Sequence, residues 1–157
     1  MTIVAFDLGL TTTGVCWGPT DHDHFVLPAK LRRSPMTDEM RQGRLAWWRS
    51  TFAMILLPHP RADVFVEAPI IHAKHAKGSV ELLKLHGVLA AVCADNDLTL
   101  TPVGNAVIKR FATGSGSADK DDMVAAAQTL GYEVEDHNTA DAIHLWRYAV
   151  TSDRGAA

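Results

Sequence analysis

The chain has 157 residues, a hydrophobic content of 47% and a formal net charge of −3. This length is enough for one domain with a full hydrophobic core, which we expect over residues 1–151, followed by a frayed tail over 152–157. No stretch reaches the length of about 18 apolar residues that a membrane span requires, and the first residues lack the pattern of a signal peptide. The acidic net charge argues against a general nucleic-acid coat protein, which is usually basic.

Apolar runs, periodicity and turn residues divide the chain into strands and helices. Apolar residues are continuous in strands that are buried on both faces, recur every three or four positions in helices, and stop at clusters of Gly, Pro and Ser. The expected strands cover residues 2–8, 14–17, 25–27, 62–68 and 98–103, and the expected helices cover residues 35–57, 79–95, 106–112, 119–130 and 138–151. The Gly/Ser segment 113–117 is expected to be a flexible loop, with Ser117 or Asp119 capping the next helix.

The order of these elements predicts an α/β fold. The first three strands lie close together in the sequence, which favours antiparallel hairpins. The two later strands each follow a helix, which favours parallel crossover connections. We therefore expect a five-stranded mixed sheet, with three antiparallel strands followed by two parallel strands, and helices on both faces.

Three acidic residues occupy positions where a carboxylate is costly. Asp7 and Glu67 each end an apolar run that we expect to be a buried strand, and Asp141 lies among alanines and Ile143 on the last expected helix. A buried carboxylate is unfavourable unless it is paired or holds a cation. If the strands that end at Asp7 and Glu67 are parallel neighbours, both acids project from the sheet edge where α/β proteins place ligands.

The alternative for each acid taken alone is a turn cap, a lysine partner or a surface position. Taken together they favour a metal site. Ligands that offer only oxygen favour Mg²⁺ or Mn²⁺ over zinc. Two such ions, about 3.5–4 Å apart, are the usual device for phosphodiester hydrolysis. The acids therefore predict two-metal hydrolysis of a nucleic acid.

Five motifs follow one another along the chain. They are residues 5–15 (Ala-Phe-Asp-Leu-Gly-Leu-Thr-Thr-Thr-Gly-Val), 66–69 (Val-Glu-Ala-Pro), 85–89 (Leu-His-Gly-Val-Leu), 107–120, which holds Lys109, Gly114, Gly116 and Lys120, and 136–142 (Asp-His-Asn-Thr-Ala-Asp-Ala). In this order they resemble the RuvC family of Holliday-junction resolvases, which have the RNase H-like fold. The resemblance extends over roughly residues 3–150.

The resemblance implies a homodimeric nuclease that nicks opposed strands of a four-way DNA junction with Mg²⁺ or Mn²⁺, leaving 5′-phosphate and 3′-hydroxyl ends. Asp7, Glu67 and Asp141 would be metal ligands, and Lys109 and Lys120 would lie near the scissile phosphate. A lysine suits this role as a point charge. The expected DNA contacts are Lys74, Lys77, Lys109, Arg110 and Lys120.

The chain departs from the family pattern at the fourth ligand. The family places an acid or a histidine three residues before the last aspartate, whereas this chain has Asn138 there, His137 one residue earlier and Asp136 before that. Positions three and four residues before Asp141 lie on its helix face. We expect Asn138 as the ligand and His137 as an accessory catalytic residue that binds metal or carries a proton. The departure and the short chain favour a phage-type protein acting in the host cytoplasm; a cellular bacterial enzyme is the alternative.

Some segments of the chain also allow other interpretations. Residues 7–12 also resemble the first phosphate loop of actin-like and Hsp70-like ATPases, but the chain is too short for their second lobe. Another RNase H-like nuclease, acting on forks, flaps or RNA–DNA hybrids, would use the same metal chemistry. His72 and His75 are interpreted as parts of a surface or DNA-facing loop and not as a zinc site, because no cysteines accompany them. Cys16 and Cys93 lack metal-type spacing, which fits a reducing compartment.

Overall fold

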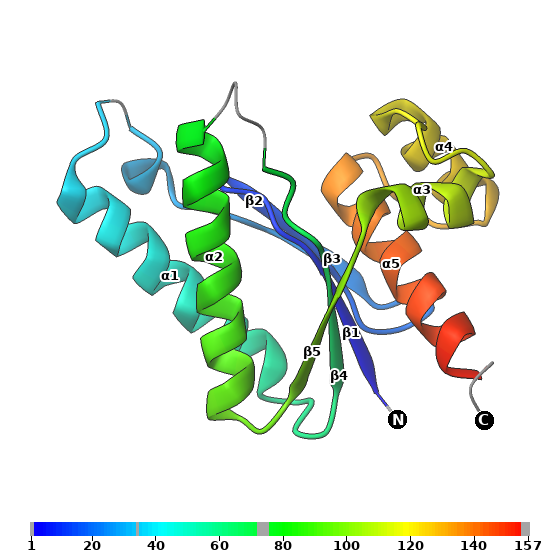
Figure 1. Ribbon diagram of the computed structural model, residues 1–157, viewed down its shortest axis with the longest axis horizontal. Helices are drawn as coiled ribbons and strands as arrows, with labels where there is room; N and C mark the ends of the chain where they lie inside the picture. Colours follow the sequence, from blue (N-terminus) through cyan, green and yellow to red (C-terminus); the bar gives the residue numbers. More distant parts are fainter. Residues whose placement is uncertain (1, 34, 72–75, 155–157) are drawn as a thin grey trace.

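A computed structural model describes residues 2–33, 35–71 and 76–154. Figure 1 shows a twisted sheet between two layers of helices. The elements are β1 (Ile3–Asp7), β2 (Thr12–Cys16), β3 (His22–Val26), the 3₁₀ turn η1 (Ala29–Leu31), α1 (Asp38–Leu56), β4 (Asp63–Glu67), α2 (Ala76–Asp95), β5 (Thr99–Val103), α3 (Asn105–Thr113), α4 (Lys120–Thr129) and α5 (His137–Arg154). Within these ranges no helix is long and apolar enough to cross a membrane.

The sheet has the predicted topology. Its strand order is β3-β2-β1-β4-β5. The pairs β1–β2 and β2–β3 are antiparallel, and the pairs β1–β4 and β4–β5 are parallel. The expected α/β class and the mixed five-stranded sheet are therefore confirmed.

Several boundaries differ from the sequence prediction. β2 begins at Thr12 and not at Gly14, α1 begins at Asp38 and not at Pro35, and α2 begins at Ala76 and not at Ser79. β3 begins at His22, earlier than expected, because His22, Asp23 and His24 occupy a largely exposed edge strand with no apolar pattern. The expected helix end at Thr151 is wrong, since α5 continues to Arg154. The predicted cap of α4 is Asp119, whose carboxylate accepts from the Asp122 amide while Asp122 accepts from the Asp119 amide.

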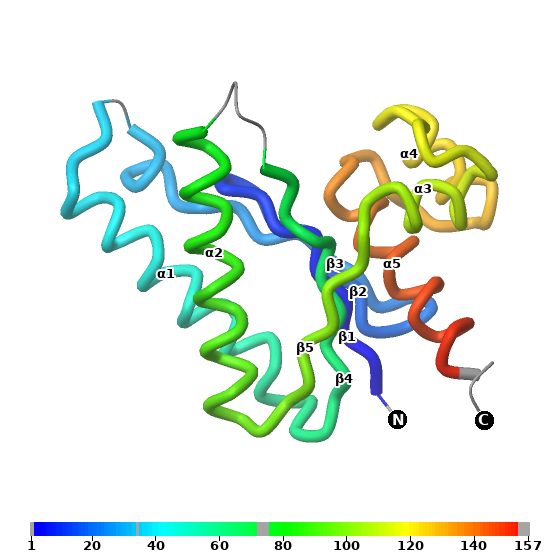
Figure 2. Tube along the Cα trace, in the orientation of Figure 1, coloured from blue at the N-terminus to red at the C-terminus, as the bar shows by residue number. Residues whose placement is uncertain are grey.

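Side-chain alternation along the strands fills both faces of the sheet. Val4 and Phe6 of β1 and Val64 and Val66 of β4 pack in one core with α1 and α2, where Phe6 meets Phe52 edge to face. The intervening Ala5 packs with α3 and α5 on the opposite face, together with Phe65. Figures 1 and 2 show the same division, with α1 and α2 on one side of the sheet and α3, α4 and α5 on the other.

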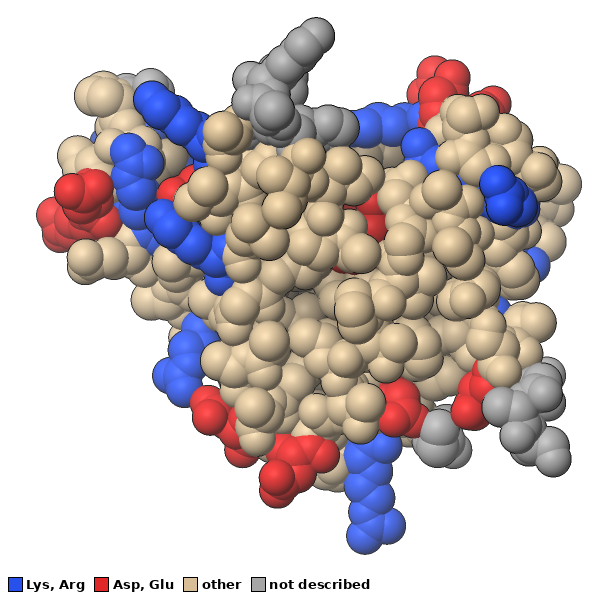
Figure 3. All heavy atoms as spheres, in the orientation of Figure 1, with Lys and Arg blue, Asp and Glu red and all other residues tan. Residues whose placement is uncertain are grey.

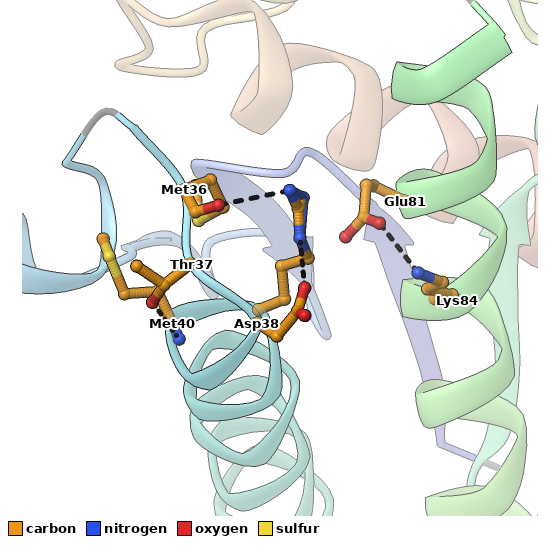
Figure 4. Close-up of polar contacts among 7 residues, drawn as sticks. Met36, Thr37, Asp38, Met40, Glu81 and Lys84 are labelled. Carbon is orange, nitrogen blue, oxygen red and sulfur yellow. Dashed lines mark hydrogen bonds and ion pairs between the residues drawn. The ribbon is translucent and has the colours of Figure 1, made fainter.

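Local contacts hold the start of the long helix α1. Thr37 caps it by accepting a hydrogen bond of 3.2 Å from the Met40 amide. Arg41 donates to the Met36 carbonyl and to Asp38 (Figure 4). The ion pair of Lys84 with Glu81 lies across from this cap on α2. These contacts are mostly exposed, so we expect the apolar face of α1, and not these polar groups, to dominate its stability.

Two neighbouring leucines at the end of α1 test whether its apolar face dominates its stability. Leu56 is 2% exposed and Leu57 is 79% exposed. Leu56→Ala should lower the free energy of unfolding by about 2–5 kcal/mol because it leaves a cavity in the core. Leu57→Ala should change it by no more than about 0.5 kcal/mol. Urea denaturation of both variants measures the difference, and equal effects would contradict the assignment of the core.

Candidate metal centre

Asp7, Glu67 and Asp141 converge on the side of the sheet that faces α5. Asp7 lies two positions after Ala5 on β1, and Glu67 lies two positions after Phe65 on β4. Side chains two residues apart on a strand point to the same face, so all four share this one. The parallel register pairs Phe6 with Val66, which places the two acids side by side at the ends of β1 and β4. Asp141 comes from α5, and carboxylate oxygens of the three residues all lie within 4.8 Å of one another. The structure therefore brings together the three acids that the sequence singled out.

Burial and mutual repulsion make this cluster unfavourable when fully charged. Burial first, and then the charges of Glu67 and Asp141, raise the pKa of Asp7 well above its usual range. Burial and the charge of Glu67 raise the pKa of Asp141 to about 7. Burial also raises the pKa of Glu67, although hydrogen bonds from Asn105 and Asp7 and the charge of Lys109 oppose this. The cluster therefore holds protons near neutral pH unless a cation replaces them.

The donor set fits a divalent cation. The Asp141 Oδ1 atom is buried and has no hydrogen-bond partner among the residues that the structure describes. A buried polar atom without a partner is costly, and a bound cation would satisfy it. All three residues offer carboxylate oxygen, the ligand that Mg²⁺ and Mn²⁺ prefer. These residues could therefore hold one or more such ions.

Helix α3 presents two side chains to Glu67. The Asn105 amide donates a short hydrogen bond to Glu67 Oε1. Lys109 lies one turn later on the same helix, and its charge lowers the pKa values of both Glu67 and Asp141. Lys109 was expected near the site. Asn105 was missed because an asparagine at the start of a helix is ordinarily interpreted as a capping residue.

Lys120 and His137 form a pair beside the acids. Lys120 begins α4, and its Nζ lies 2.9 Å from His137 Nε2 at the start of α5. Burial, and then the charge of Lys120, lower the pKa of His137. A neutral imidazole can accept a hydrogen bond from the ammonium group, so this geometry places His137 against Lys120. The charge of Lys120 also lowers the pKa values of Asp7 and Asp141, which places this ammonium group close to the acids.

The first turn of α5 lies directly against β2. Asp136 caps this turn by accepting from the Thr139 amide at 2.9 Å, and its second oxygen lies 3.5 Å from His24 Nδ1. A Cβ atom added at Gly14 would collide with the Asn138 backbone. Gly14 pairs with Asp7 across the β1–β2 ladder. The glycine therefore lets α5 come close enough for Asp141 to reach Asp7.

The three residues expected near the fourth ligand position, Asp136, His137 and Asn138, make different contacts. Asp136 is engaged in the helix cap and by His24, and His137 contacts Lys120. Asn138 lies at the close approach, with its Oδ1 at 3.8 Å from the position of a Cβ on Gly9. None of the three belongs to the cluster of carboxylate oxygens formed by the described residues. Asn138 as a metal ligand and His137 as an accessory catalytic residue remain predictions.

A cleft of about 430 Å³ opens over Asp7 and Glu67. In Figure 3 acidic atoms lie in the hollow between the α1–α2 half and the α3–α5 half, below basic atoms on the upper rim. Its lining is charged at the base and largely apolar along α2 and the preceding loop: Asp7, Leu8, Glu67, Ala68, Pro69, Ile70, Leu82, His86 and Lys120. His86 could not be predicted in this cleft, because it lies beside the core residue Leu85 in a regular helix and carries no separate sequence signal.

Two of the other predicted DNA contacts, Lys77 and Arg110, lie apart from the cleft lining. Lys77 is exposed at the start of α2 and lines a separate groove of about 500 Å³ with Arg41 and Lys84. Arg110 is exposed on α3. Lys74, His72 and His75 lie outside the described residues. The structure therefore groups Lys109 and Lys120, but not Lys77 or Arg110, with the three acids.

Solved structures of RuvC resolvases have this fold. The chain is similar to Thermus thermophilus RuvC in complex with a Holliday junction substrate, with a TM-score of 0.73 and 14% identity over 98% of this chain and 96% of that chain. A second Thermus thermophilus RuvC structure matches with a TM-score of 0.67 and 14% identity over 99% and 97% of the two chains. The yeast mitochondrial Holliday junction resolvase Ydc2 matches with a TM-score of 0.57 and 11% identity over 98% and 82%. The resemblance to the RuvC family is therefore confirmed at the level of the fold.

Sequence comparisons add no further relative. No protein-family model matches the chain, and no curated protein matches it significantly. At identities of 11–14% the structural matches establish the fold and not the activity.

Gly14→Ala tests the close approach of α5. The added Cβ would push the Asn138 backbone away, so we expect the free energy of unfolding to fall by about 1–3 kcal/mol. Gly78→Ala is the matched control, since its Cβ would meet nothing within 4 Å and alanine favours a helix by about 0.5–1 kcal/mol. Urea denaturation compares the two. A Gly14→Ala chain as stable as the wild type would contradict the packing described.

Asp141→Asn tests whether burial and repulsion between the carboxylates destabilise the folded chain. The pKa of Asp141 is raised from 3.8 to about 7, so between these values the folded chain keeps a proton that the unfolded chain has released. The free energy of unfolding of the metal-free chain therefore falls as the pH rises through this window. Without this carboxylate the variant should exceed the wild type in stability by about 1 kcal/mol or more at pH 7.5, and differ little near pH 4.

Urea denaturation in EDTA at both pH values measures this effect. Asp153→Asn, a substitution at the exposed end of α5, is the control and should leave the pH dependence unchanged. If Asp141→Asn is no more stable than the wild type at pH 7.5, the carboxylates do not repel one another as described.

Proposed function

We propose that this chain is a metal-dependent, structure-specific endonuclease that nicks four-way DNA junctions. The observation that carries the proposal is the convergence of Asp7, Glu67 and Asp141 within 4.8 Å, at the strand ends of a fold shared with RuvC resolvases. The Thermus thermophilus RuvC with a TM-score of 0.73 was solved with a Holliday junction substrate. The acidic cluster alone would support only a metal site, and the structural similarity alone would support only a fold.

The three carboxylates would hold Mg²⁺ or Mn²⁺, with two ions as the expected number and Asn138 as a further oxygen ligand. When bound, such ions activate water and stabilise the charge on the leaving oxygen of a phosphodiester. Cleavage would leave 5′-phosphate and 3′-hydroxyl ends. The role of the chain is to place its acids in a cleft, where less water surrounds them and their electrostatic attraction for a cation is stronger than in open solvent.

The lysines would hold the scissile phosphate over these acids. Lys120 lines the cleft with Asp7 and Glu67, and the charge of Lys109 acts on Glu67 and Asp141. His137 contacts the Lys120 ammonium group and would keep it directed at the phosphate. Lys77 and Arg110 would contact more distant phosphates, and the number of phosphates contacted determines the salt dependence of binding. Lys74, outside the described residues, stays a predicted DNA contact.

Nicking both opposed strands of a junction requires two sites, so we propose that the protein acts as a homodimer. An exposed apolar face on α2 supports this. Val80 is 48% exposed and Leu83 is 38% exposed, and Gly87, Ala90 and Ala91 continue the same exposed face along the helix. Small side chains in such a row would let two helices pack closely across a two-fold axis. The proposed setting is the cytoplasm of a bacterium or of the host of a phage.

Asp7→Asn is the direct test of the proposed activity. The substitution removes a metal ligand and leaves the lysines in place, so we expect cleavage of a synthetic four-way junction to be abolished while junction binding is retained. Cleavage is followed on labelled junctions with Mg²⁺ or Mn²⁺, and binding by gel shift in Ca²⁺. Asp153→Asn, on the exposed end of α5, should cut at the wild-type rate.

The same assay with Y-forks, flaps, linear duplexes and RNA–DNA hybrids defines the substrate. Preferential cleavage of four-way junctions supports the proposal. A wild-type chain that cuts hybrids or flaps but not junctions would make it a different RNase H-like nuclease. An Asp7→Asn chain that cuts junctions at the normal rate would refute the role of the acidic cluster.

A further inference from the structure

We propose that Asn105, at the start of α3, is a positioning residue that makes Glu67 a one-oxygen ligand of a divalent cation bound by Asp7, Glu67 and Asp141. The inference rests on the proposed function only in taking a divalent cation as the group that these acids hold. It requires no particular DNA substrate.

The contact itself defines which Glu67 oxygen is available. The Asn105 side-chain amide donates to Glu67 Oε1. A carboxylate oxygen that accepts from an amide is less available to a cation, so Oε2 is the oxygen that remains for metal binding. Glu67 would then bind through one oxygen and would not chelate through both. The orientation of the amide follows from chemistry, because a carboxylate can only accept and the NH₂ group of asparagine donates.

The fold places Asn105 at this position through the sheet register. β4 and β5 are parallel neighbours, and Glu67 pairs with Val103. The Ala68 amide continues this ladder by donating to the Val103 carbonyl at 2.7 Å. Gly104 is extended and is the N-cap of α3, so Asn105 is the first residue of the helix. Asn105 therefore comes two residues after Val103, the strand partner of Glu67. Its position is therefore determined by the same parallel ladder that places Glu67.

A neutral donor is suited to this task in a way that a cation is not. A lysine at position 105 would orient Glu67 but would also offset the negative charge that attracts a metal ion. Asn105 restricts the side chain of Glu67, which has several rotatable bonds, without adding charge. Lys109, one turn along α3, supplies the positive charge separately. Hydrogen-bonding partners of metal ligands of this kind typically change metal affinity by about 10–100-fold when removed.

Mn²⁺ binding to the DNA-free protein tests the inference. Electron paramagnetic resonance of free Mn²⁺ gives the dissociation constant for the wild type, Asn105→Ala and Asn105→Leu. Both variants lose the donor, but the leucine keeps a side chain of similar volume. We expect both to bind Mn²⁺ about 10–100-fold more weakly than the wild type. Asn96→Ala is the matched control, since Asn96 donates to the Val92 carbonyl at the far end of α2, and its affinity should be unchanged.

Thermal unfolding of the metal-free variants separates positioning from folding. Asn105 is only half-buried, so we expect unfolding midpoints close to the wild type in EDTA. Weaker Mn²⁺ binding with an unchanged metal-free midpoint supports the inference. Affinities within twofold of the wild type in both Asn105 variants would overturn it, as would a wild-type chain that binds no Mn²⁺.

The Mn²⁺-binding measurement and the junction-cleavage assay can fail independently of each other. A wild-type chain whose Mn²⁺ binding depends on Asp7 and on Asn105, but which cuts no DNA, would refute the nuclease and leave this inference intact. A chain that cuts junctions, and whose Asn105 variants bind Mn²⁺ as the wild type does, would leave the nuclease and overturn the inference.

Discussion

The mutual repulsion of three buried carboxylates is the constraint on which the rest of this structure depends. Asp7, Glu67 and Asp141 are brought within 4.8 Å of one another in a partly closed cleft. Desolvation raises the pKa of each of them, and the charge of Glu67 raises the pKa values of Asp7 and Asp141 further. The fold tolerates this arrangement only because the remaining contacts hold the backbone of all three elements in place. Such a cluster is stable with protons near neutral pH, or with cations in their place.

Small residues and hydrogen-bonded partners supply those contacts. Gly14 admits the first turn of α5 against β2, and Ala140 and Ala142 of this helix are fully buried. Asn105 and Lys120 each act on one or more of the acids from α3 and α4. The apolar layer of α1 and α2 lies on the opposite face of the sheet and contributes stability, and Leu82 and His86 of α2 also line the cleft over the acids. Helix α2 therefore serves both the core and one wall of the site.

Much of the fold could be predicted from the sequence, because its signals are local. Continuous apolar runs identified β1 and β4, and chain order determined which pairs are parallel. The third strand was predicted, but its first residues, 22–24, were missed because an exposed edge strand needs no apolar residues. In the site, the acids were visible as charges in apolar surroundings. Asn105 and His86 were not, because only the β4–β5 register and the packing of α2 bring them to the cleft.

Proton release on Mn²⁺ binding tests the central claim that cations replace protons in this cluster. Titration calorimetry of the metal-free chain near pH 6.5, in buffers with different ionisation enthalpies, counts the protons released per ion bound. The pKa of Asp141 is about 7, and that of Asp7 lies well above its usual range, so binding should release protons and the observed heat should change with the buffer. Mn²⁺ binding without proton release, or no binding at all, would contradict this account of the three acids.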